Sequence, residues 1–194
     1  MGIVNTLTNK SREGVSTVLG VDASTNSFAF CLFGVEGPIR WGELTFNGEN
    51  VFERLSHGQR NVYAVREYLK SDLVVFESAV FVQNKKTVIQ LAYAFGAVVS
   101  ALLTDGTKVE EIAPLAWQNA IGNKPLNKAE KDFIITQFPG KSKSWYQNKN
   151  REVRKGRTMK WCEDTYGIRV KSDNVSDAIA IASVAHHIYA APKT

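Results

Sequence analysis

The arrangement of short apolar segments near the start of the chain constrains its fold more than any other feature. Residues 17–23, 28–35 and 39–46 are each short, apolar and rich in aromatic or β-branched residues, a pattern typical of β-strands. Only a few turn-forming residues, such as Gly37-Pro38, separate one segment from the next. Because antiparallel strands are the ones that short turns can join, the three segments predict an antiparallel meander.

The rest of the chain alternates between strand-like and helix-like segments. Two further strands are predicted at 72–77 and 109–112. The spacing of apolar residues predicts helices over 51–69, 87–103, 114–121, 129–138, 151–166 and 175–189, with a polar loop over 139–150. This order predicts an α/β fold whose five-stranded mixed sheet is the meander extended by two strands and flanked by helices. We expect residues 1–16 to form a flexible arm and residues 17–194 to form a single domain.

Composition excludes several classes of protein. The two cysteines, Cys31 and Cys162, are far apart and no CxxC or paired-histidine motif accompanies them, which argues against a zinc site and against a disulfide scaffold. No apolar segment approaches the roughly 20 residues that span a bilayer. We therefore expect a cytoplasmic protein without a membrane partner.

Acidic residues stand at three positions where they are costly unless they have a function. Asp22 directly follows the first strand, and Glu77 ends the fourth. Asp177 lies near the start of the last helix, with Asp173 and Asn174 one turn earlier on the same helix face. An acid next to a buried strand must be solvated or paired with a cation, and several acids at one edge would repel one another. A divalent cation with oxygen ligands, Mg²⁺ or Mn²⁺, relieves that repulsion, so these five residues are candidate catalytic and metal-binding residues.

The chemistry that such a site supports is phosphodiester hydrolysis. Two cations roughly 3.5–4 Å apart activate a water molecule and stabilise the leaving oxygen. Each acid also has a simpler interpretation: Asp22 as a turn residue, Glu77 as a surface charge, Asp173 or Asn174 as a helix cap, and Asp177 as a complement to the helix dipole. The ordered set, rather than any one acid, favours the nuclease hypothesis.

Basic residues are concentrated in an insert at about 139–160. The chain carries a net charge of +5, yet residues 141–160 contain eight basic residues and one acid. Such cations neutralise phosphates, and the interleaved aromatic side chains can stack on unpaired bases. The candidate DNA-binding residues are Phe81, Lys85, Lys86, Lys124, Lys128, Lys131, Lys141, Lys143, Trp145, Tyr146, Lys149, Arg151, Arg154, Lys155 and Arg157. The alternatives are a solvated basic surface for the insert and a core position for Phe81.

Four motifs in sequence order carry a resemblance to a known family. They are LGVDAS at 19–24, FESAVFVQN at 76–84, EIAP at 111–114 and SDAIAIA at 176–182. Together they resemble the RuvC family of Holliday junction resolvases. The resemblance implies an RNase H-like fold, a homodimer, and two Mg²⁺ ions per site, with Mn²⁺ able to substitute. It implies Asp22, Glu77 and Asp177 as metal ligands, and paired nicks in four-way and other branched DNA as the activity.

Two departures from the family pattern keep alternatives open. The family usually has an acid three residues before its last Asp, where this chain has Asn174 beside Asp173, so either residue could be the fourth ligand. The basic insert is longer than in the short cellular enzymes and looks like that of phage-type members. The alternatives are another RNase H-like nuclease, acting on RNA–DNA hybrids, flaps or forks, and a non-catalytic protein that binds branched DNA. A sugar kinase or actin-like ATPase shares the GVDAST pattern at 20–25, but it needs two such domains and the chain is too short.

Overall fold

A five-stranded mixed sheet forms the centre of the computed structural model, which describes residues 14–78, 85–103 and 106–190. The strands are β1 (Val18–Ala23), β2 (Ser27–Gly34), β3 (Gly37–Thr45), β4 (Leu73–Glu77) and β5 (Lys108–Ile112), in the order β3-β2-β1-β4-β5. Strands β1, β2 and β3 pair antiparallel, whereas β4 runs parallel to both β1 and β5. The sheet predicted from the sequence is therefore confirmed.

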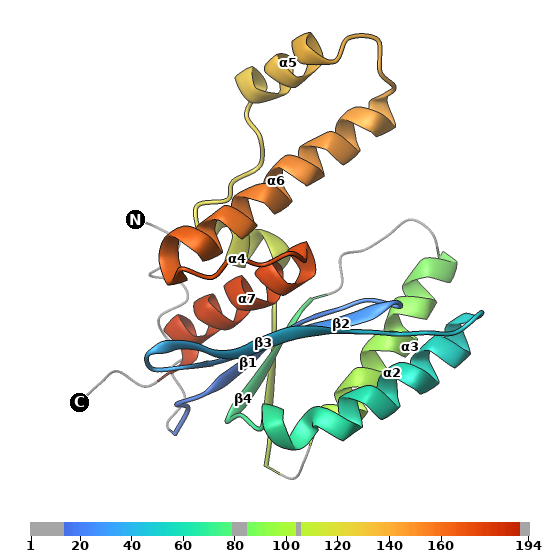
Figure 1. Cartoon of the computed structure of the whole chain (residues 1–194), viewed down its shortest axis with the longest axis vertical. Coiled ribbons are helices and arrows are strands. Elements are labelled where there is room, and N and C mark those ends of the chain that lie inside the picture. The colour runs from blue at the N-terminus through green and yellow to red at the C-terminus, as the bar shows by residue number, and fades with distance from the viewer. Residues whose placement is uncertain (1–13, 79–84, 104–105, 191–194) are drawn as a thin grey trace.

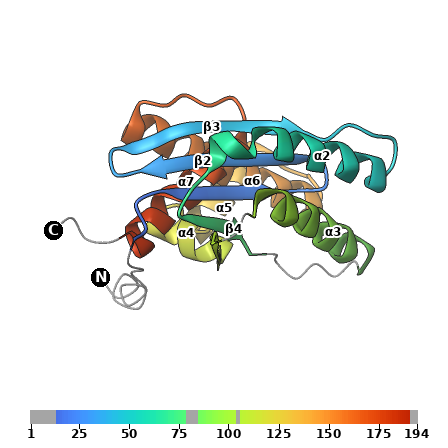
Figure 2. The ribbon, with the colours of Figure 1, turned by 90° about the horizontal axis from the view of Figure 1, so that it is seen from below.

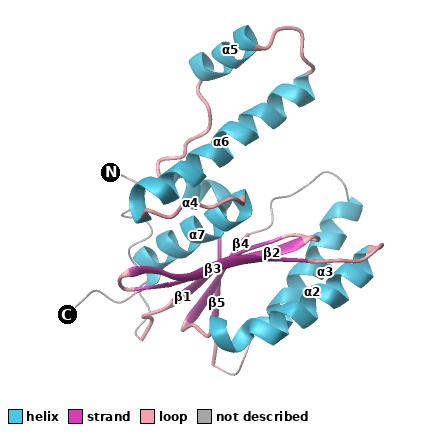
Figure 3. Cartoon of the chain, in the orientation of Figure 1, coloured by secondary structure: helices cyan, strands magenta, loops and turns pink. Residues whose placement is uncertain are grey.

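Helices cover both faces of this sheet (Figures 1 and 2). One face carries α2 (Val51–Val65), the short 3₁₀ helix η2 (Arg66–Leu69) and α3 (Lys85–Leu102). The opposite face carries α4 (Pro114–Ala120) and α7 (Asp173–Tyr189). Helices α5 (Lys128–Gln137) and α6 (Lys143–Tyr166) form a hairpin that projects beyond the sheet, as Figure 3 shows.

The hairpin corrects one expectation from the sequence. The polar loop predicted over 139–150 is wrong for most of its length, because α6 begins at Lys143 and runs unbroken to Tyr166. Ser142 caps the helix by accepting a hydrogen bond from the backbone N–H of Trp145 at 3.2 Å. Amphipathic periodicity is weak in this first part of α6 because the hairpin stands away from the core, so only the cap marks the true start.

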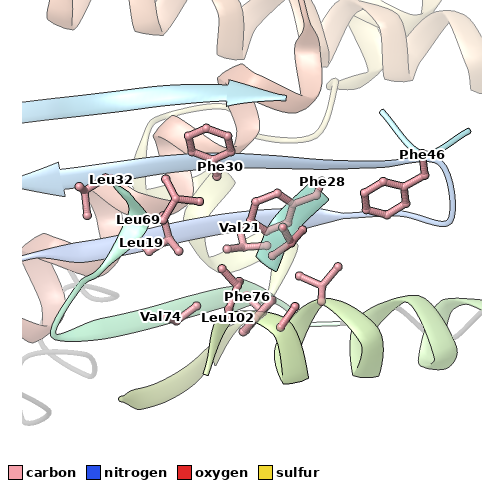
Figure 4. Close-up of a cluster of buried hydrophobic side chains, with 13 residues drawn as sticks. Leu19, Val21, Phe28, Phe30, Leu32, Phe46, Leu69, Val74, Phe76 and Leu102 are labelled. Atoms are coloured by element: carbon pink, nitrogen blue, oxygen red, sulfur yellow. The ribbon is translucent and has the colours of Figure 1, made fainter. Parts of the chain in front are cut away.

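Two apolar cores form because alternate residues of each strand point to opposite faces. Leu19 and Val21 of β1 cluster with Phe28, Val74 and other residues, as Figure 4 shows, and this core includes buried residues of α2 and α3. Val18 and, in β2, Ala29 and Cys31 pack on the other face against α7. By the same alternation, Gly20 and Asp22 lie on the α7 face.

The end of the predicted N-terminal arm contacts the domain, while residues 1–13 lie outside the described part of the chain. Val15 is buried in the core under α7. The backbone N–H groups of Ser16 and Thr17 both donate to the Asp72 carboxylate at 2.8 Å. Among the described residues, no helix is both long and apolar enough to cross a membrane.

Candidate active site

The sheet register lines up acidic residues across its strands. Asp22 of β1 pairs with Ala29 of β2, and Ala29 pairs with Glu43 of β3, so the side chains of all three point to the α7 face. On the other side of β1, Val21 pairs with Phe76, which places Glu77 at the end of β4 beside the end of β1. The carboxylates of Asp22, Glu43 and Glu77 therefore lie near the same end of the strands of the sheet.

The N-terminus of α7 brings further oxygen donors to the same region. Helix α7 packs directly on β1 and β2, and its first two turns carry Asp173, Asn174 and Asp177. Asp177 lies close enough to Asp22 and Glu77 for their charges to repel. The structure thus brings together all five residues that the sequence predicts for the metal site.

Burial and mutual repulsion change the acidity of these groups. Burial, followed by the charge of Glu77, raises the pKa of Asp22 to about 7. Burial, followed by the charge of Asp22, raises the pKa of Asp177 to about 8. Burial also raises the pKa of Glu77, although the indole Nε1–H of Trp117 donates to its Oε1 at 2.8 Å. Keeping these carboxylates ionised together is therefore unfavourable without a cation.

Two observations test whether a divalent cation suits this arrangement. The Oδ1 atom of Asp177 is buried and has no hydrogen-bond partner, so it lacks the interaction that a buried polar atom requires. The donors are carboxylate and amide oxygens, which hard cations such as Mg²⁺ prefer. Within the described ranges, however, no three His, Cys, Asp or Glu side chains form a ready-made metal cluster. The donor chemistry fits Mg²⁺, and the acids are drawn from three strands and one helix.

A lysine from α6 lies among these acids. The Nζ atom of Lys155 forms an ion pair with Oδ2 of Asp173, and its charge also acts on Asp22, Glu77 and Asp177. Burial opposes ionisation of Asp173, but the hydrogen bond and the charge of Lys155, together with backbone hydrogen bonds, outweigh it and lower the pKa of Asp173. The sequence indicated Lys155 only as a DNA-binding residue, and the structure places it at the acids.

Glu43 is a site residue that the sequence analysis missed. Its Oε1 accepts a hydrogen bond from Nδ2 of Asn174 at 2.8 Å, and its Oε2 accepts one from Oγ of Ser172 at 2.6 Å. Although burial alone would raise its pKa, the bonds from Ser172, Asn174 and Ser27 together lower it. No signal in the sequence marks Glu43, because only the register of β3 against β2 turns it toward the site.

Some of the predicted DNA-binding cations line two grooves of α6. A groove of about 550 Å³ beside Asp173 is lined by Arg151 and Lys155, together with Lys171, which the sequence analysis did not single out. A second groove, of about 480 Å³, lies between α5 and α6 and is lined by Lys131, Lys141, Lys143 and Tyr146. Lys124 and Lys128 are exposed outside both grooves.

Other predicted DNA-binding residues make contacts within the protein. Arg154 donates to the side-chain oxygen of Gln118, and Arg157 forms an ion pair with Glu130 that ties α6 to α5. Lys149 pairs with Glu152 at 2.9 Å. The Arg154 contact thus joins α6 to α4, the Arg157 pair joins the two helices of the hairpin, and the Lys149 pair lies within α6.

The aromatic residues of the insert close the end of the hairpin. The rings of Trp145 and Phe138 lie 5.2 Å apart, and the hydroxyl of Tyr146 donates to the carbonyl of Phe138 at 2.6 Å. Of the candidates near the fourth strand, Phe81 lies outside the described residues. Lys85 is the first residue of α3, and Lys86 is exposed.

Comparison with solved structures supports the fold derived above. The RuvC protein of Thermus thermophilus in complex with a Holliday junction substrate superposes with a TM-score of 0.64 at 16% identity, covering 89% of this chain and 94% of that chain. Another structure of Thermus thermophilus RuvC gives a TM-score of 0.61 at 18% identity with the same coverage. No curated protein sequence matches. At these identities the likeness shows a common RNase H-like fold.

A match to a protein family identifies the family, whereas structural similarity at these identities shows only the fold. Residues 18–138 match the family described as Crossover junction endodeoxyribonuclease RuvC. The match covers more than half of the chain and includes the strand ends that carry Asp22 and Glu77. With its RNase H-like sheet and its acids at the ends of β1 and β4, this chain belongs to the RuvC family.

Proposed function

We propose that this protein is a metal-dependent endonuclease that cuts four-way and other branched DNA junctions by paired nicks. The observation that carries the proposal is the convergence of Asp22, Glu77 and Asp177, with an unpartnered buried oxygen on Asp177, beside a cation-lined groove of α6. Family membership supports the proposal, as does the RuvC structure that contains a Holliday junction substrate. An enzyme that acts on recombining DNA must be in the compartment that holds the DNA. For a bacterial or phage protein, that compartment is the cytoplasm.

The acids would hold two Mg²⁺ ions, and Mn²⁺ would substitute because it accepts the same oxygen ligands. Asp22, Glu77 and Asp177 are the three carboxylate ligands, and the fourth ligand comes from Asp173 or Asn174 at the start of α7. When bound, such a pair of ions lowers the pKa of the attacking water and stabilises the leaving oxygen.

The chain's own side chains prepare the site for this chemistry. The indole N–H of Trp117 holds Oε1 of Glu77 and so fixes the orientation of that carboxylate. Lys155 supplies a positive charge among the acids that can attract a phosphate once the metal ions have bound. Arg151 and Lys171, which line the same groove, extend the positive surface away from the acids.

A homodimer follows from the symmetry of the substrate. Two opposed nicks in a four-way junction require two active sites related by a twofold axis, which a C2 dimer supplies. Helix α3 buries Ala94 and Val98 against the core but exposes Ile89 and Tyr93 on another face. An exposed apolar helix face of this kind suits contact with a second copy.

The test is cleavage of a labelled synthetic four-way junction beside a linear duplex of matched sequence, with Mg²⁺ and with EDTA. The proteins compared are the wild type, Asp22→Asn, and Asp164→Asn as an exposed control on α6. Symmetric nicks in the junction alone, lost with EDTA and with Asp22→Asn but kept with Asp164→Asn, support the proposal.

Two other outcomes would contradict it. Tight binding of the junction without cleavage would indicate a non-catalytic branched-DNA binding protein, the alternative that Asn174 in place of an acid keeps open. Metal-dependent cleavage of hybrids, flaps or forks in preference to four-way junctions would indicate another RNase H-like nuclease.

A further inference from the structure

Both oxygens of the Glu43 carboxylate are used by the segment that begins α7. Oε1 accepts from the side-chain Nδ2 of Asn174 at 2.8 Å, and Oε2 accepts from the hydroxyl of Ser172 at 2.6 Å. The same Nδ2 donates a longer bond, 3.4 Å, to the hydroxyl of Ser27. Glu43 therefore directs a hydrogen bond from each of its oxygens to the segment that begins α7.

The chemistry of this contact decides which end of the Asn174 amide is available. An ionised carboxylate only accepts hydrogen bonds, so it binds the NH₂ end of an amide and repels the oxygen end. With its NH₂ held by Glu43 and Ser27, Asn174 has its oxygen Oδ1 left to offer. Asn174 also lies three residues before Asp177, on the same side of α7 as the buried Oδ1 atom that lacks a partner.

We propose that Glu43 is a positioning residue that makes Asn174 an oxygen ligand for the cation held by Asp177, an inference that rests on the proposed metal-dependent function. By fixing the amide, Glu43 selects Asn174 rather than Asp173 as the fourth ligand. Asp173 is instead engaged by Lys155. An aspartate at position 174 would place a second carboxylate against Glu43, and like charges at hydrogen-bonding distance repel. Glu43 and Asn174 thus form a matched pair.

The test is a thermodynamic cycle on metal affinity. Isothermal titration with Mn²⁺ alone, without DNA, compares the wild type with Glu43→Gln, Asn174→Asp and the double variant. Glu43→Gln presents an NH₂ group as well as an oxygen, so it no longer selects the NH₂ end of the Asn174 amide, and affinity should fall about 10- to 100-fold, as is typical when a residue supporting a metal ligand is removed. Asn174→Asp should also weaken binding, because its carboxylate faces that of Glu43.

The double variant distinguishes positioning from a general structural role. The glutamine that Glu43→Gln introduces would donate its NH₂ to the carboxylate that Asn174→Asp introduces, so the double variant should bind Mn²⁺ more tightly than either single variant. If the affinity losses of the two single variants simply multiply in the double variant, the proposal is overturned, because independent structural damage accumulates in this way. Glu36→Gln, in the exposed turn between β2 and β3, is the matched control and should bind as the wild type does.

Further measurements keep the proposal open to refutation. Thermal unfolding in EDTA checks that each variant folds. Asn174→Ala leaves Glu43 in place, so it should lose affinity to a similar degree, and wild-type affinity in that variant would overturn the proposal even if Glu43→Gln did not fold. If the wild type binds Mn²⁺ in a manner that requires Asp22 but Glu43→Gln binds equally well, only the role of Glu43 is wrong. If the wild type does not bind Mn²⁺, the proposed function fails as well.

Discussion

Gly20 of β1 lies in direct backbone contact with Ala182 of α7. A Cβ atom at Gly20 would lie 2.4 Å from the backbone nitrogen of Ala182 and 2.6 Å from the carbonyl oxygen of Ala178. Because these atoms belong to the backbone of a packed helix, they cannot move aside singly. This close approach sets the distance between β1, which carries Asp22, and the start of α7, which carries Asp177.

We expect Gly20→Ala to lower the free energy of unfolding by about 1–3 kcal/mol, the usual cost of inserting atoms into a packed core. It should also weaken Mg²⁺ binding, because α7 must move away from β1. Denaturant unfolding and metal titration measure the two effects. Gly156→Ala on α6 is the control: a Cβ there meets no atom within 4 Å, so this variant should be as stable as the wild type or slightly more so. Equal stability of Gly20→Ala and the wild type would contradict the close contact.

Stability without metal should fall as the pH rises. Burial and neighbouring charge raise the pKa of Asp22 to about 7 and that of Asp177 to about 8, both above the usual 3.8. The folded state therefore holds these protons more tightly than the unfolded state, and the stabilisation is complete below about pH 4 and disappears as the pH rises through about 7 to 8. In EDTA, the melting temperature should decrease over this range. Asp177→Asn should reduce the decrease, and its persistence in a double variant with Asp22→Asn would contradict the explanation.

Added Mg²⁺ should oppose this loss of stability at higher pH. The cation binds the ionised carboxylates, so its stabilising effect should be larger at about pH 8 than at about pH 5. Thermal unfolding with and without Mg²⁺ at both pH values gives the comparison. The same measurement on Asp177→Asn should show little Mg²⁺ effect at either pH.

The groove between α5 and α6 predicts a salt-dependent contribution to DNA binding. Lys131 and Lys143 line this groove on opposite helices of the hairpin, which projects beyond the sheet (Figure 1), and none of the acids lines it. The double variant Lys131→Ala, Lys143→Ala should bind a junction more weakly, and the slope of log K against log salt should decrease by about one for each phosphate that the variant no longer neutralises. Mg²⁺ affinity should not change.

A matched control removes the same charge elsewhere. Lys70 precedes β4 and Lys108 begins β5, at the opposite ends of those strands from Glu77. Lys70→Ala, Lys108→Ala should leave the salt slope unchanged. Equal slopes for the two double variants would show that net charge, rather than the groove, attracts the DNA.

The sequence predicted the sheet and the main acids because those features are local. An apolar segment followed at once by an acid, as at Val21-Asp22 and Phe76-Glu77, marks a strand end without reference to any partner. The face to which Glu43 points depends instead on the register of β3 against β2. Counted from the turn, where Gly34 pairs with Gly37, an uninterrupted hairpin would place Glu43 opposite Phe28, facing the other core. An irregularity between Leu32 and Phe33 shifts the register by one residue and so turns Glu43 toward α7.

The hydrogen bonds of the α6 cations could not be predicted from the sequence either. Charge density predicted a DNA-binding surface over 139–160, but which cations face solvent depends on how α6 packs. Arg154 and Arg157 are held by Gln118 and Glu130, residues about thirty positions earlier in the chain. A one-dimensional pattern contains no information on pairs at that separation, so it assigned all the cations to one role.

Helix α3 gives the last prediction, which concerns the dimer. Ile89, Tyr93 and Gly96 follow one another at intervals of four and three residues and so share one face of the helix. This face is open: Ile89 is 51% exposed, Tyr93 is 49% exposed, and a Cβ at Gly96 would meet no atom within 4 Å. A glycine beside exposed apolar side chains permits close approach of a second helix, so Tyr93→Asp should convert a dimer to a monomer by burying an unpaired charge. Sedimentation velocity measures the change, with Tyr68→Asp on η2 as a comparably exposed control that should remain dimeric. Because one monomer carries one active site, Tyr93→Asp should also change paired nicks in a four-way junction into single, uncoordinated nicks. A wild type that is monomeric, or a Tyr93→Asp variant that still dimerises, would mean that another surface joins the two sites.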